Sequence, residues 1–127
     1  MITGSEEITC PLTDHEREVL LPLFIAGLSR HVGKENPVTS AEIIAAMGER
    51  GHKVSGGRVR KVINHIRIHA LLPMVLADTN GYWVSDDMAE VALYVRSLKD
   101  REDAIRAMRV AIQQQAETKW QHQFEFA

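Results

Sequence analysis

The stretch SGGRVRKVINHIRIHALLPMVLADTNGYWV, residues 55–84, decides the fold of this chain. Its first half spaces apolar side chains so that one helical stripe faces a core; these are Val59, Val62, Ile63, Ile66 and Ala70. Pro73 ends the helix, and two β-favouring runs then flank Asn80-Gly81, the strongest hairpin signal, since both central turn residues must tolerate positive φ. We expect a helix over residues 55–71 and then a β-hairpin, with Trp83 facing the core.

Two helices are predicted before this stretch, each opened by a capping box, in which a hydroxyl and a carboxylate satisfy opposite backbone amides. The boxes are Thr13-Asp14-His15-Glu16 and Thr39-Ser40-Ala41-Glu42. Pro22 should kink or locally break the first helix, which Gly33 and Pro37 then end. Ser55 is the predicted N-cap of the third helix, after a brief glycine-containing turn of helix-turn-helix spacing. Val38 is placed to add a short third strand to the hairpin.

The sequence pattern after the hairpin predicts a further helix. Ser85-Asp86-Asp87 caps it, and its apolar face is interrupted near Asp100, so the sequence allows one helix to about residue 117 or two that meet there. We expect flexible tails at residues 1–12 and 119–127, one domain at 13–99 and a C-terminal helix at 100–118. The predicted fold class is α+β, mainly α.

Charge is distributed unevenly along the chain. The formal net charge is −2, yet residues 48–70 hold six basic side chains and one acidic one. A basic island in an otherwise acidic chain is typical of a polyanion partner at one face, although a solvated basic helix surface would give the same count. The polar face of the third helix contains no carboxylate, which favours nucleic acid.

The predicted DNA-binding residues lie at the start and on the polar face of that helix. Gly56 and Gly57 would let a phosphate approach the helix N-terminus. The full set is Lys53, Ser55, Gly56, Gly57, Arg58, Arg60, Lys61, Asn64 and Arg67.

The order of elements resembles a winged helix, and three motifs resemble a family of small bacterial and prophage winged-helix proteins. The motifs are Gly33-Lys34-Glu35-Asn36-Pro37-Val38-Thr39-Ser40, the run from Ser55 to Arg67, and Pro73 with Gly81-Tyr82-Trp83-Val84. The resemblance covers residues 13–99 and implies binding of double-stranded DNA in transcription or replication. An alternative is a winged-helix module that binds proteins and not DNA.

No catalytic motif is recognised, so we do not expect an enzyme, a cofactor or a metal site. His15-Glu16-Arg17-Glu18-Val19 has Val19 where a zinc-protease helix needs its second histidine. Cys10 is the only cysteine, which excludes an internal disulfide. The longest apolar run is half of what a bilayer span needs, and no signal peptide is visible, so we expect a cytoplasmic protein without a membrane partner.

Two features suggest protein partners. A narrow apolar stripe after Asp100 would pair with a second chain to give a homodimer; its members are Ala104, Ile105, Met108, Ala111 and Ile112. Packing of this stripe back onto the first helix is the alternative. The end of the chain, Gln123-Phe124-Glu125-Phe126-Ala127, resembles peptides that bind the bacterial sliding clamp, although Ala127 stands where an aromatic residue is expected.

Overall fold

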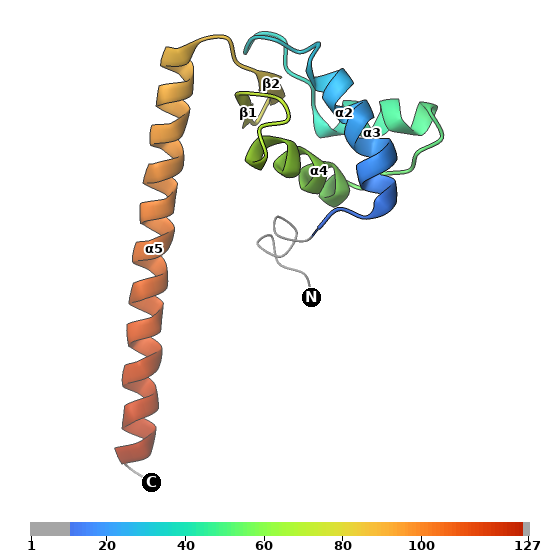
Figure 1. Ribbon diagram of the computed structural model, residues 1–127. Coiled ribbons are helices and arrows are strands. Elements are labelled where there is room, and N and C mark those ends of the chain that lie inside the picture. Colours follow the sequence, from blue (N-terminus) through green and yellow to red (C-terminus); the bar gives the residue numbers. More distant parts are fainter. Residues whose placement is uncertain (1–10, 126–127) are drawn as a thin grey trace. The chain divides into compact units, whose positions relative to one another are not determined.

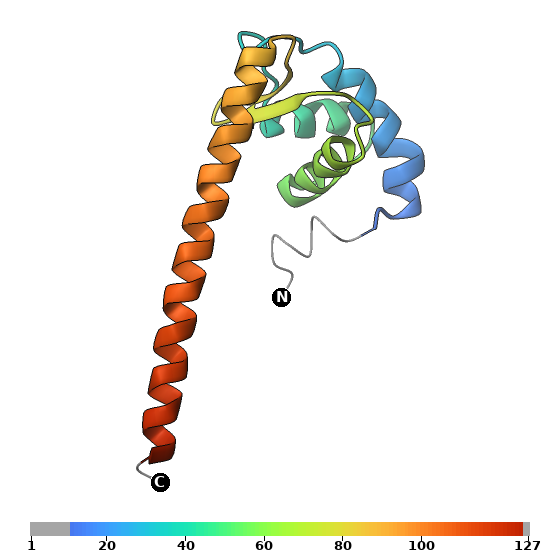
Figure 2. The same ribbon diagram turned by 60° about the vertical axis from the view of Figure 1, so that its left-hand side comes forward.

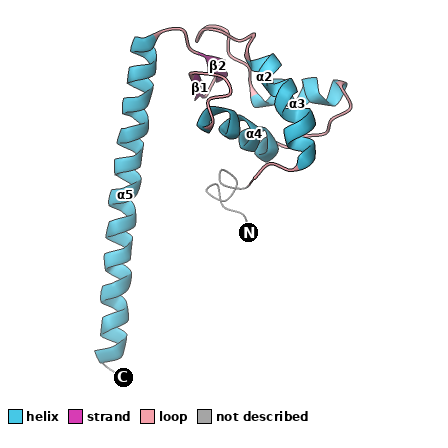
Figure 3. Cartoon of the chain, in the orientation of Figure 1, coloured by secondary structure: helices cyan, strands magenta, loops and turns pink. Residues whose placement is uncertain are grey.

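The computed structural model describes residues 11–125, with side chains through Gln121, and shows an α+β, mainly helical protein with one two-stranded antiparallel hairpin (Figures 1 and 3). The chain divides into two compact units, residues 1–91 and 92–127. The first unit contains every helix and strand before the last helix, and also the start of the last helix, up to Val91. The second unit contains the rest of the last helix.

The first helix begins after Thr13, as its capping box predicts. The Thr13 amide donates to Glu16 Oε1 at 2.8 Å, and the Glu16 amide donates to Thr13 Oγ1 at 3.2 Å. A π-helical segment, η1 (Glu16–Leu20), continues into α2 (Leu21–Leu28). Pro22 lies in the first turn of α2 and has no amide to donate, which accounts for the wider turn before it and matches the predicted local break. Leu12, assigned to a flexible tail, is instead buried in the core.

The helix ends at Leu28, earlier than Gly33, because the backbone that follows is used elsewhere. Val84 donates its amide to the His31 carbonyl at 2.8 Å, and its own carbonyl accepts the Gly33 amide at 2.9 Å. Residues 31–33 therefore cannot continue the helix.

The next two helices, α3 (Ser40–Glu49) and α4 (Gly56–Ile68), have the predicted N-caps. Thr39 and Glu42 form a complete capping box, and Ser55 Oγ accepts the Arg58 amide at 3.2 Å. Both helices end in a left-handed residue, Gly51 (φ 83°) and Ala70 (φ 54°). After each, an amide donates back to the carbonyl five residues earlier, which is the Schellman arrangement. This stop ends α4 before residue 71 and leaves Ala70 exposed, not in the core stripe.

The predicted hairpin is present as β1 (Val75–Asp78) and β2 (Gly81–Val84), but its turn differs from the expected one. Thr79 and Asn80 form the loop with negative φ, and the positive φ belongs to Gly81 (126°), which pairs with Asp78. The Asn80 amide donates to Asp78 Oδ1 at 2.7 Å and fixes the loop. A Cβ at Gly81 would collide with the carbonyl of Val38, so glycine is required beside the neighbouring segment.

On its other edge, β2 bonds to residues 31–38. Val38 and Tyr82 exchange two backbone hydrogen bonds of 2.8 Å, as the predicted third-strand position implies, and Val32 bridges Val84. Because α4 packs against α2 and α3, and β2 contacts α2, the core lies between these helices and the hairpin (Figure 2). Its fully buried members are Leu20, Val59, Val62, Ile63 and Ile66.

The last helix, α5 (Met88–Glu125), is continuous, so the alternative of two helices meeting near Asp100 is wrong. Its N-cap is Asp87, whose carboxylate accepts the Ala89 amide at 2.9 Å. The Glu90 carboxylate accepts hydrogen bonds from Trp83 Nε1–H and Ser85 Oγ–H, both at 2.8 Å. Trp83 is buried in the core, as predicted. The helix passes residue 119 without a break, which corrects the predicted flexible tail as far as Glu125.

Candidate nucleic-acid interface

Helix α4 carries most of the predicted DNA-binding residues, and its burial divides them by face. Lys53, Ser55, Gly56 and Arg60 are exposed, whereas Gly57, Arg58, Lys61, Asn64 and Arg67 are half-buried. Opposite them, α4 contributes its buried stripe to the core. The helix itself contains no acidic residue, as its sequence shows.

A carboxylate nevertheless lies against this basic helix, and it comes from the first helix. Glu16 is 2% exposed, and its Oε1 accepts a hydrogen bond from Lys61 Nζ at 2.8 Å. Its Oε2 lies 3.1 Å from Arg58 Nε. One buried carboxylate therefore engages two cations that we predicted to contact DNA, and it also closes the Thr13 capping box.

The protonation of Glu16 reflects these contacts. Burial alone would raise its pKa, but the hydrogen bond from Lys61, the Thr13 amide and the positive charges of Lys61 and Arg58 together hold the pKa of Glu16 below its ordinary value. Glu16 is therefore ionised at neutral pH. The side chain of Lys61 is only 18% exposed, so reaching a DNA phosphate would require breaking a buried ion pair.

Sequence reasoning does not identify Glu16 as part of this site. The capping box explains one carboxylate oxygen, and it gives no sign of a partner 45 residues away. Arg58 and Lys61 connect α4 to the first helix, and Arg60, Asn64 and Arg67 lie at helical spacing along the adjoining face.

At the start of α4, Gly56 is exposed and Gly57 is half-buried. A Cβ at Gly56 would meet nothing within 4 Å. The Ser55 hydroxyl caps the Arg58 amide, and Lys53 is exposed just before it. The helix N-terminus thus presents an accessible backbone beside basic side chains.

Histidines cluster at the other end of α4. The His65 and His69 rings are 4.3 Å apart between centroids. Burial, the neighbouring His69 and Arg17 lower the pKa of His65, so it is neutral at pH 7. Among the residues that the structure describes, no three metal-ligating side chains come together.

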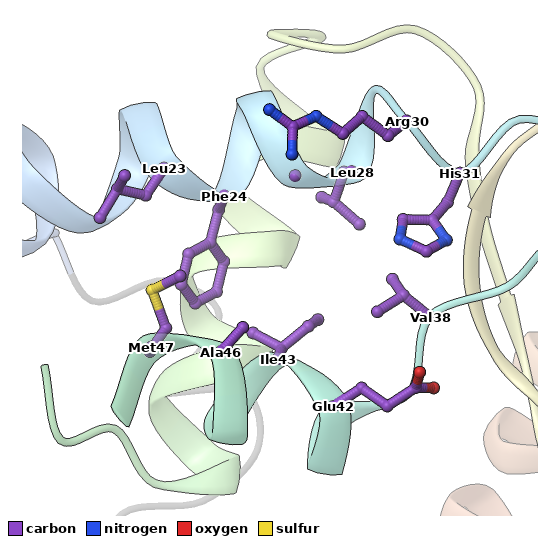
Figure 4. Close-up of a pocket in the computed structure, with 11 residues that line it drawn as sticks. Leu23, Phe24, Leu28, Arg30, His31, Val38, Glu42, Ile43, Ala46 and Met47 are labelled. Carbon is purple, nitrogen blue, oxygen red and sulfur yellow. The ribbon is translucent and has the colours of Figure 1, made fainter. Parts of the chain in front are cut away.

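A small cavity of about 200 Å³ lies between α2 and α3 (Figure 4). Phe24, Ile43 and Met47 supply apolar lining, and Arg30, His31 and Glu42 supply the ionisable groups. The Glu42 carboxylate is used in the Thr39 capping box, which lowers the pKa of Glu42. The volume is below the range of about 300–1,000 Å³ typical of small-molecule sites, so this cavity does not compete with the α4 face.

The predicted pairing stripe lies on α5 and is exposed. Ile105 is 70% and Met108 66% exposed, and Ala104, Ala111 and Ile112 are also exposed. The sequence resembling a clamp-binding peptide, residues 123–127, has side chains outside the described part of the chain.

Comparisons with protein-family models, curated proteins and solved structures found no match. No helix within residues 11–125 is long and apolar enough to cross a membrane.

Proposed function

We propose that the first unit is a winged helix that binds double-stranded DNA through α4. The observation that carries the proposal is the face of α4 on which Arg60, Asn64 and Arg67 follow one another with no acidic residue on the helix. The element order and the bonds from residues 32–38 to β2 support it, as does the resemblance to small bacterial and prophage winged-helix proteins.

The residue types suit distinct contacts in this proposal. Arg60 and Arg67 would contact phosphates and position the helix. Asn64 would pair with an adenine edge in the major groove, where its amide donates and accepts at once. Gly56 would let a phosphate approach the helix N-terminus.

Glu16 changes the roles of the other predicted residues. Since Arg58 and Lys61 are paired with it, we assign them to holding α4 against the first helix. The proposed DNA contacts are Arg60, Asn64 and Arg67, because they follow one another at helical spacing along one face of α4. The proposed biological role is regulation of phage or bacterial transcription or replication.

The first prediction tests the DNA contacts by salt titration on a random duplex. Replacing Arg60 and Arg67 with Ala removes two phosphate contacts, so the log–log salt slope should fall by roughly 1.8, since each contact contributes about 0.9. The control is Arg106→Ala together with Lys119→Ala on α5, which removes the same charge far along the chain from α4.

Two results would contradict the proposal. If the wild-type chain shows no salt-dependent affinity for duplex DNA, the alternative of a protein-binding module replaces it. If both double variants lower the slope equally, only net charge is involved.

A second prediction tests whether Asn64 contacts a base or only positions the helix on the backbone. Asn64→Ala should weaken the selection of preferred sequences from a random DNA pool, while its affinity for a random duplex should stay unchanged.

A further inference from the structure

Helix α5 has large apolar side chains in solvent, and these follow a regular order. Every described side chain from Val95 to Gln121 is exposed. From residue 91 to residue 112, residues spaced seven apart are apolar, and Lys119 follows at the same spacing: the apolar members are Val91, Leu98, Ile105 and Ile112. Three residues after each come Tyr94, Arg101, Met108 and Gln115. These two series are the a and d positions of a heptad repeat, and together we call them the α5 seam.

The seam needs a partner because the polar contacts of the described helix do not cover its apolar side chains. Side chains four residues apart are linked from Lys99 to Asp103 at 3.0 Å, from Arg109 to Gln113 at 3.0 Å and from Gln113 to Glu117 at 3.2 Å. These links stabilise the helix but leave Ile105, Met108 and Ile112 in water. A second helix packed on the seam would remove Leu98, Ile105, Met108 and Ile112 from water.

The polar members of the seam identify the partner as a second copy, aligned in parallel. In a parallel, in-register pair each layer faces itself, so Gln115 meets Gln115 of the other copy, and amides pair with one another. Arg101, at d, meets Arg101 of the other copy in the same way, and Glu102, at the following e position of each helix, supplies the opposite charge beside this pair. In an antiparallel pair a faces d, so each overlapping alignment sets Arg101 or Gln115 against an apolar a residue.

Small apolar residues lie beside the seam. Ala104 and Ala111 precede Ile105 and Ile112 at the g positions and widen the apolar face there. The five residues that the sequence predicts for pairing all lie on or next to the seam.

We propose that α5 pairs with α5 of a second copy as a parallel two-stranded coiled coil along the α5 seam. This proposal does not rest on DNA binding, and its test needs no DNA. Because each α5 follows directly from the first unit, a parallel pair connects two first units at the same end of the coiled coil.

The test is sedimentation equilibrium of the full chain at tens of micromolar. The wild type should sediment at twice the 14.3 kDa monomer mass. Ile105→Lys places a charge in the seam, so this variant should sediment at the monomer mass. Val110→Lys is the matched control, since Val110 is an exposed apolar residue at the f position opposite the seam, and it should leave the dimer intact.

A second variant changes affinity in the opposite direction. Arg101→Leu fills the d position with the residue that parallel dimers favour, so the dimer should dissociate at lower concentration than the wild type. A monomeric wild type, a dimer that survives Ile105→Lys, or equal loss in Ile105→Lys and Val110→Lys would overturn the proposal.

Orientation is tested by oxidation of Gln115→Cys in a Cys10→Ser background. Only a parallel, in-register pair brings the two introduced thiols opposite each other, so a disulfide-linked dimer should form. A dimer in which Gln115→Cys does not cross-link, while a mixture of Gln115→Cys and Leu98→Cys chains does, would show antiparallel pairing and overturn the assignment.

Discussion

At the scale of single residues, Glu16 joins the first helix to α4 through a buried carboxylate. It closes a capping box, and it binds one lysine and one arginine from another helix. Within residues 11–121, every buried side-chain nitrogen or oxygen has a hydrogen-bond partner. Removal of the Glu16 charge would leave Lys61 as a largely buried cation without its counterion.

Glu16→Gln should therefore lower the free energy of unfolding by about 2 kcal/mol, less than a fully buried pair would lose because Arg58 and Lys61 keep some access to water. Urea denaturation at pH 7 measures it. Glu18→Gln, an exposed neighbour on the same helix, should change stability by about 0.5 kcal/mol or less. Equal effects of the two variants would mean that the Glu16 pairs contribute nothing.

The Glu16 carboxylate should also make the free energy of unfolding depend on pH in the acid range. The folded-state pKa of Glu16 lies below its ordinary value of 4.5, so the unfolded chain binds more protons as the pH falls through this range. Its stabilisation is thus present above about pH 4.5 and lost as the pH falls through the folded pKa. The difference in stability between wild type and Glu16→Gln should shrink below pH 4.5; a constant difference would contradict the assignment.

At the scale of elements, the hairpin turn depends on one glycine in contact with a distant segment. Gly81 has a φ of 126°, and a Cβ there would meet the Val38 carbonyl carbon at 2.7 Å. Both the backbone conformation and the space exclude a side chain. By contrast, Gly48 lies inside α3, and a Cβ at that position would meet nothing within 4 Å.

Gly81→Ala should accordingly destabilise the protein by about 2 kcal/mol or more, because it adds backbone strain to a collision with backbone. Gly48→Ala should raise stability by about 0.5–1 kcal/mol through helix propensity. Thermal unfolding monitored by circular dichroism compares the two. Similar shifts for both variants would show that the contact between Gly81 and Val38 is absent in solution.

The elements also show how far sequence can predict this fold. Capping boxes, the Ser55 cap and the existence of the hairpin depend on neighbouring residues, and the sequence predicts them all. The early end of α2, the contact of Gly81 with Val38 and the pairing of Glu16 depend on residues far along the chain, and the sequence alone does not reveal them. For the candidate site, the sequence identifies the helix and its basic residues, but only the structure shows that Arg58 and Lys61 are engaged.

At the scale of the whole molecule, the two units have different sources of stability. The first unit has a buried core, whereas the described side chains of α5 beyond Tyr94 are exposed. The boundary at Val91 means that a chain ending at Lys99 retains the complete first unit.

Truncation after Lys99 should leave a cooperatively folded monomer. Of the two tryptophans only Trp83 then remains, and because it is 3% exposed and bonded to Glu90, its fluorescence reports unfolding of the first unit alone. The urea midpoint of the truncated chain should match the urea midpoint of the full-length Ile105→Lys variant. Unfolding of the full-length variant is monitored by near-ultraviolet circular dichroism. Loss of the cooperative transition on truncation would show that residues 100–127 are part of the first unit's core.

The bonding of β2 on both edges has a kinetic consequence. Its bonds to Val38 close a loop of about 44 residues, and ordering such a loop costs entropy before the contact is gained. The helices and the β1–β2 hairpin join residues that are close in sequence and can form early, but the bonding of Val38 to β2 waits for this non-local contact, which makes it an expected slow step of folding. During synthesis Val38 emerges well before Tyr82, so a nascent chain passes through a stage in which its three helices have no sheet to close the core. Glu90, which accepts the Trp83 indole bond, lies in the first turn of α5, so the first unit can complete its folding only after synthesis of α5 has begun.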